Sequence, residues 1–179
     1  RKVAKVEARY ELFLAVPSDA VAMACLSHME DVSLPAFSGF GFLSSLSDAV
    51  SQGQFATLSE APMAVSLHYS GKLSPLYIFD VGAASSVPSS EASELMDFGQ
   101  RNGLQTSYVD CSSVIEDQEL ASRSLVLMAE TETLLKSSAR HLSQSLSVMG
   151  NPGFAQAADA ASGTDLLFVS YAQAKPIFT

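Results

Sequence analysis

The stretch MAVSLHYSGKLSPLYIFDV, residues 63–81, decides the fold. Residues 63–69 alternate larger apolar side chains with small or polar ones, which predicts a strand with one buried and one exposed face. The turn Ser70-Gly71-Lys72 leads into residues 76–81, which are apolar on both sides and therefore predict an inner strand. We expect the two strands to form an antiparallel hairpin.

Apolar runs next to turn signals predict further strands on both sides of this hairpin. They cover residues 12–16, 20–26, 104–111, 124–129 and 165–171. Apolar residues at helical spacing predict helices between them. These cover residues 42–51, 89–102, 131–146 and 151–163. The third has the clearest stripe, which includes Leu135, Leu142 and Leu146.

This order of hairpins and crossovers predicts an α+β fold. We expect a two-layer arrangement, with a mostly antiparallel or mixed sheet and helices covering one face. The length of 179 residues suits one domain. Residues 11–179 are therefore expected to form a single α+β domain, and a continuation past Thr179 stays open because no turn or cap follows residues 172–176.

Charge and hydropathy argue against a nucleic-acid partner and against a membrane-spanning segment. The chain has 19 acidic and 10 basic side chains, a net charge of -9, which opposes binding to nucleic acid. No apolar stretch approaches the roughly 18 residues that a membrane helix needs. We therefore expect neither a nucleic-acid partner nor a transmembrane span in this sequence.

The first ten residues are a basic flank, with Arg1, Lys2, Lys5 and Arg9, and the chain opens without methionine. We expect a trimmed chain whose missing N-terminal segment is a signal peptide or membrane anchor. A basic flank beside a membrane helix normally faces the cytoplasm, which argues against an outer location. The favoured expectation remains an exported protein.

The two cysteines, Cys25 and Cys111, form neither a CxxC pair nor a disulfide framework. The favoured interpretation is two small buried apolar residues. A single disulfide that links two strands is the alternative.

The side chains that could carry chemistry are few. His28, His68 and His141 lie too far apart for a zinc motif, and His141 is expected on the surface or flank of its helix. The pattern GxSxG of many serine hydrolases is absent. The acidic residues at 116–119 and at Glu130 and Glu132 lack the spacing of a calcium loop and are expected in solvent. We predict no catalytic residue, no metal site and no cofactor.

A binding site can still be assembled from scattered residues. Ser66 and His68 fall on the same side of one strand and Tyr69 follows them, so these three residues are one candidate. Phe40 is another, because the loop Phe37-Ser38-Gly39-Phe40-Gly41-Phe42 either fills the core or exposes an apolar surface that docks a partner.

Several segments resemble a known family. They are Val16-Pro17-Ser18-Asp19-Ala20, Pro62-Met63-Ala64-Val65-Ser66-Leu67-His68, and Thr133-Leu134-Leu135-Lys136 with Arg140-His141-Leu142 followed by Phe154. Together they resemble bacterial cell-envelope proteins that carry a domain of unknown function behind a signal or membrane anchor. The likeness covers most of the chain, through packing and turn patterns. It implies an exported, anchored protein at the envelope or periplasmic face, such as a lipoprotein, and it implies no catalytic residues.

These observations leave two hypotheses. The first is a non-catalytic envelope domain that acts by binding or assembly, with a protein or an envelope component as partner. The alternative is an enzyme or small-molecule-binding protein whose site lies near Ser66, His68 and Tyr69.

Overall fold

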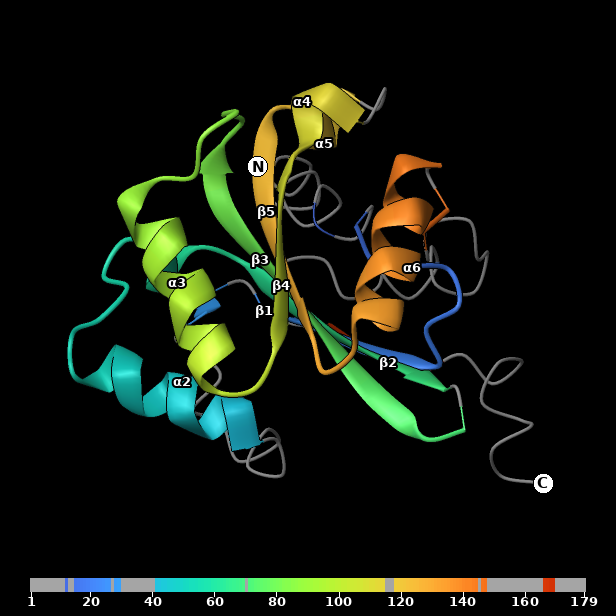
Figure 1. The fold of residues 1–179 in the computed structure, drawn as a ribbon, viewed down its shortest axis with the longest axis horizontal. Coiled ribbons are helices and arrows are strands. Elements are labelled where there is room, and N and C mark those ends of the chain that lie inside the picture. The colour runs from blue at the N-terminus through green and yellow to red at the C-terminus, as the bar shows by residue number, and fades with distance from the viewer. Residues whose placement is uncertain are drawn as a thin grey trace.

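The computed structural model describes residues 12, 15–26, 28–29, 41–69, 71–114, 118–144, 146–147 and 166–169. Six strands form one sheet in the order β4-β5-β3-β2-β1-β6 (Figure 1), and each of its pairings is antiparallel. The strands are β1 Ala22–Leu26, β2 Met63–Tyr69, β3 Leu73–Ala83, β4 Gln105–Asp110, β5 Arg123–Ala129 and β6 Leu166–Val169.

The described helices are α2 Gly41–Ser51, α3 Ser90–Arg101, α4 Cys111–Val114, α5 Gln118–Ala121 and α6 Glu132–Ser143, with a 3-10 turn at Leu58–Glu60. The expected α+β class, the antiparallel sheet and the β2–β3 hairpin are confirmed. The helices at residues 42–51, 89–102 and 131–146 are present with slightly shorter or shifted bounds, while α4 and α5 were not predicted because each is a single turn.

Helices cover both faces of the sheet rather than one. Successive β5 residues alternate between two apolar clusters: Leu125 and Leu127 pack in the cluster that includes α6, whereas Val126 and Met128 pack in the cluster that includes α2 and α3. Figure 1 shows α2 and α3 on one side of the strands and α6 on the other. The molecule therefore has three layers, and its central strands are buried on both faces.

Strand β2 differs from its prediction for this reason. The side with the small and polar residues, expected in solvent, is buried: Ala64 and Ser66 are fully covered and His68 is 4% exposed, whereas Tyr69 at the end of the strand is 49% exposed. Ala64 shares its cluster with Val16 and with Leu135 of α6, so the segment before β1 and this helix cover the β2 side chains.

The described residues of the range 12–16 do not form the predicted strand. Leu12 is helical, Ala15 and Val16 lie in a turn and bend, and all three are buried. These apolar side chains lie in the core, but a short buried run does not distinguish a strand from a turn. Helix α6 also ends earlier than expected, so Leu146 lies beyond it and is exposed.

Helix ends follow the sequence signals. Ser89 caps α3, since its hydroxyl accepts a hydrogen bond from the Ala92 N–H at 3.1 Å, and Thr131 caps α6 in the same way through the Leu134 N–H at 3.2 Å. Gly103 follows α3 with a φ of 84°, a conformation that suits glycine. The predicted helix at 151–163 lies outside the described residues.

Both cysteines are buried, and neither forms a disulfide. Cys25 lies on β1 and Cys111 directly follows β4, and three strands separate these two in the sheet. Four strand spacings of about 4.8 Å place them roughly 19 Å apart, too far for a disulfide. The disulfide alternative is therefore wrong. Among the described residues, no helix is long and apolar enough to cross a membrane.

Candidate functional site

Three separate segments bring polar side chains together on the α6 face of the sheet. Asp19 lies in the turn before β1, Ser66 and His68 lie on β2, and His141 lies on α6. The turn is held at both ends, because the Ser18 N–H donates to the Leu146 carbonyl at 3.1 Å and the Val21 N–H donates to the Leu67 carbonyl at 2.8 Å. The backbone therefore fixes Asp19 beside β2 and the end of α6.

Ser66 and His68 form a buried polar pair. The Ser66 hydroxyl oxygen lies 2.7 Å from Nε2 of His68, and Nδ1 of the same ring lies 3.2 Å from Oδ1 of Asp19. A carboxylate only accepts hydrogen bonds, so the hydrogen of a neutral ring belongs on Nδ1 and Nε2 accepts from Ser66. The distance between Nδ1 and the Asp19 carboxylate suits a hydrogen bond, but its angle is poor, so this hydrogen bond is bent.

His141 approaches Asp19 from α6. Its Nδ1 donates to the Ser137 carbonyl at 2.8 Å. The other ring nitrogen, Nε2, points toward Asp19 and lies 4.0 Å from Oδ1. The side chain is 17% exposed, which fits the flank of the helix and not its fully exposed side. Asp19 therefore has an imidazole on either side.

This environment keeps Asp19 ionised. The pKa of Asp19 lies below its usual value, first because of hydrogen bonding to His68; partial burial opposes this shift, and the charges of His68 and His141 add to it. At neutral pH the carboxylate is consequently a stable acceptor and a weak base.

The order of the three groups is the reverse of that in a serine hydrolase. In such an enzyme the serine faces the substrate and the carboxylate is buried behind the histidine. Here Ser66 is fully buried, while the Asp19 side chain is 52% exposed. A substrate can reach the carboxylate and cannot reach the hydroxyl.

The Asp19 side chain lines a pocket of about 460 Å³ at the β2–β3 hairpin and the start of α6. Most of the lining side chains carry a hydroxyl group. The lining residues are Asp19, His68, Tyr69, Lys72, Ser74, Thr131, Thr133, Leu134 and Ser137. Its volume falls in the range of small-ligand sites. The pocket combines one carboxylate with many neutral donors and acceptors.

The structure gives the predicted site residues different positions. His68 and Tyr69 line this pocket, Ser66 lies beneath it, and Phe40 lies outside the described residues. Sequence reasoning missed Asp19, which was treated as a turn residue. Its one available signal was its place in a segment that carries the family resemblance, as do Ser66, His68 and His141.

In the described parts of the chain, no group of three or more His, Cys, Asp or Glu residues is arranged to hold a metal ion. Comparison with known proteins adds no assignment, because no protein-family model, curated protein or solved structure matches the chain significantly.

Proposed function

We propose that this chain is a non-catalytic binding domain of the bacterial cell envelope, and that its pocket at Asp19 takes a small ligand rich in hydroxyl groups, such as a saccharide. The observation that carries the proposal is the half-exposed, ionised carboxylate of Asp19 in a pocket lined mainly by hydroxyl groups. A carboxylate accepts strongly from ligand hydroxyls, and serine, threonine and tyrosine hydroxyls both donate and accept.

The aromatic ring at the edge of the pocket supports the same ligand class. Tyr69 lines the pocket and is about half exposed. An aromatic ring in this position offers an apolar surface next to polar groups, which suits a sugar ring with both kinds of surface. Lys72 supplies one further donor, although it also lies 3.4 Å from Glu130.

Binding is favoured over catalysis by two properties of the site. The depressed pKa of Asp19 makes it a poor proton acceptor at neutral pH, and general bases work best when their pKa lies near the working pH. Ser66 has no exposed surface from which to attack a substrate. The Ser66–His68 pair instead positions the carboxylate, through the contact between His68 Nδ1 and Asp19 Oδ1.

Binding is tested by adding glucose, galactose, mannose and N-acetylglucosamine separately to ¹⁵N-labelled protein and recording amide shifts. We expect at least one sugar to bind in the millimolar range and to shift amides of Tyr69, Ser74 and Thr133. Asp19→Asn should weaken that binding about tenfold, because a charge-assisted hydrogen bond is lost.

Asp48→Asn is the matched control. Asp48 is exposed on α2, so this substitution removes one negative charge away from the pocket. It should leave the affinity unchanged. Absence of pocket shifts with every sugar, or equal weakening by the two substitutions, would contradict the proposed ligand.

The location is a separate part of the proposal and rests on the family resemblance. Three of the segments that carry it, around residues 16–20, 62–68 and 133–142, are those that meet at the pocket. Fractionation of the native host should place the full-length protein in the envelope fraction. Recovery in the cytosol would contradict the envelope assignment without affecting the binding site.

A further inference from the structure

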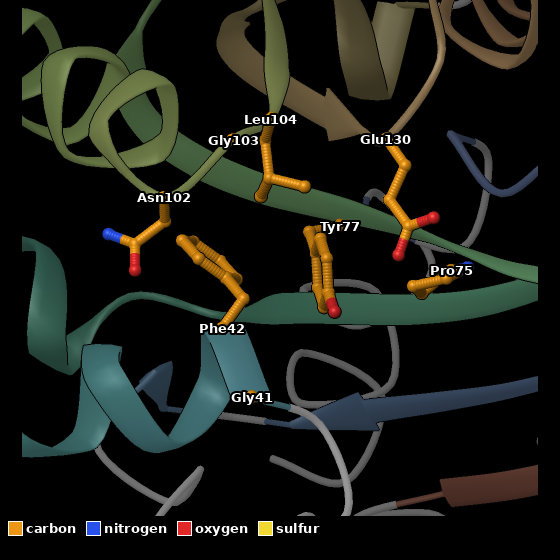
Figure 2. Close-up of a pocket in the computed structure, with 8 residues that line it drawn as sticks. All are labelled: Gly41, Phe42, Pro75, Tyr77, Asn102, Gly103, Leu104 and Glu130. Atoms are coloured by element: carbon orange, nitrogen blue, oxygen red, sulfur yellow. The ribbon is translucent and has the colours of Figure 1, made fainter.

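A second pocket lies on the opposite face of the sheet, where α2 begins and α3 ends. Its volume is about 500 Å³. Figure 2 shows its lining residues: Gly41, Phe42, Pro75, Tyr77, Asn102, Gly103, Leu104 and Glu130. Tyr77 and Phe42 belong to the apolar cluster of α2 and α3, so this site is distinct from the one at Asp19.

The centre of the pocket is aromatic. The Phe42 and Tyr77 rings lie side by side with centroids 4.8 Å apart and planes tilted by 52°. Leu104 faces them from the other side (Figure 2). All three residues are buried, and Phe42 is also held by Phe98, with ring centroids 5.8 Å apart. The apolar surface is therefore fixed before a ligand arrives, which lowers the entropic cost of binding.

The two ends of the pocket are polar, with Asn102 at one end and Glu130 at the other (Figure 2). The Asn102 amide donates to the Phe98 carbonyl at 2.8 Å, which leaves its own carbonyl oxygen as an acceptor. The Glu130 carboxylate contacts Lys72 at 3.4 Å, but Lys72 is largely exposed and Glu130 is half exposed, and such exposed pairs are weak. Both ends therefore offer acceptors to a ligand.

Tyr77 adds an unusual feature. It is 3% exposed and lines the pocket. Burial, together with the nearby charge of Glu130, raises the pKa of Tyr77 to about 12, so the hydroxyl stays protonated. A protonated phenol at the pocket wall can donate a hydrogen bond to a ligand group.

We propose that this pocket binds a planar aromatic cation, with the ring against Phe42 and Tyr77 and the positive group at Glu130. The aromatic surface favours a flat ring and also attracts a cation. Glu130 supplies the opposite charge, and the net charge of -9 draws cations toward the molecule. This inference does not depend on the proposed function of the Asp19 site.

The test uses benzamidine as the probe and benzamide as its neutral counterpart of nearly the same shape. Amide shifts of ¹⁵N-labelled protein report both the site and the affinity. Benzamidine should shift Asn102, Gly103 and Leu104 and should bind about tenfold more tightly than benzamide, the gain expected for a charge-assisted hydrogen bond.

Substitutions at the charged end make the test specific. Glu130→Gln should weaken benzamidine about tenfold and leave benzamide unchanged, because only the cation uses the carboxylate. Lys72→Met should tighten benzamidine, because it removes the competing ammonium group. Glu132→Gln is the matched control, since Glu132 is exposed on α6 and pairs with Lys136 at 3.1 Å, and it should have no effect.

Three results would overturn the inference. They are equal affinities for benzamidine and benzamide, shifts confined to the Asp19 pocket, and unchanged benzamidine binding in Glu130→Gln. Glu130 is half exposed, so its substitution leaves the fold intact, and the spectrum of each variant verifies this directly.

Discussion

At the scale of single residues, the site at Asp19 shows how accessibility decides what a group of side chains can do. Ser66, His68 and Asp19 are the residue types of a hydrolytic triad, and the contacts along them are 2.7 and 3.2 Å. Their burial runs in the opposite direction, from a covered serine to a half-exposed carboxylate. This order of burial favours the proposed role of Asp19 as an acceptor for a ligand over activation of Ser66 as a nucleophile.

Ser66→Ala tests whether the buried pair supports the site. The substitution removes the partner of a buried imidazole nitrogen, and an unsatisfied buried acceptor costs about 1–3 kcal/mol. We expect the free energy of unfolding in urea to fall by that amount.

Ser138→Ala provides the comparison. Ser138 is also buried, but its hydroxyl donates to the Leu134 carbonyl within α6, an acceptor that the helix already satisfies. Its loss should cost less than about 1 kcal/mol. Equal losses for the two alanine variants would show that the Ser66–His68 contact stabilises nothing.

At the scale of helices and strands, local signals predicted most of the fold. Ser89 and Thr131 cap their helices as short polar residues should, and Gly103 ends α3. The inner position of β3 followed from its continuous apolar run, because β2 and β5 pair with it on either side. These features depend on residues close together in the sequence.

What could not be predicted depends on contacts between distant segments. Alternation in β2 indicated one exposed face, yet the segment before β1 and helix α6 cover Ser66 and His68. Asp19 joins the site only because the backbone of its turn bonds to β2 and to Leu146. Of the site residues predicted at this pocket, His68 and Tyr69 line it. The carboxylate of Asp19, which gives the pocket its negative charge, could not be predicted from residue spacing because Asp19 is distant in sequence from the other lining residues.

At the scale of the whole molecule, three layers place two pockets of different chemistry on opposite faces of one sheet. Their nearest link is the contact between Lys72, which lines one pocket, and Glu130, which lines the other. The Asp19 site also links protonation of this carboxyl to the stability of the fold. Because the pKa of Asp19 is lowered in the folded chain, its stabilising contribution is present above its ordinary value of 3.8 and is lost as the pH falls through the lower, folded value.

The most direct test of the account is a titration of the Asp19 side-chain carboxyl by ¹³C NMR in the folded protein. An acceptor that His68 holds in its ionised form must titrate below 3.8, and His68→Phe must raise its midpoint. A midpoint at or above 3.8, unchanged in His68→Phe, would contradict the claim that the buried Ser66–His68 pair maintains this carboxylate for a ligand.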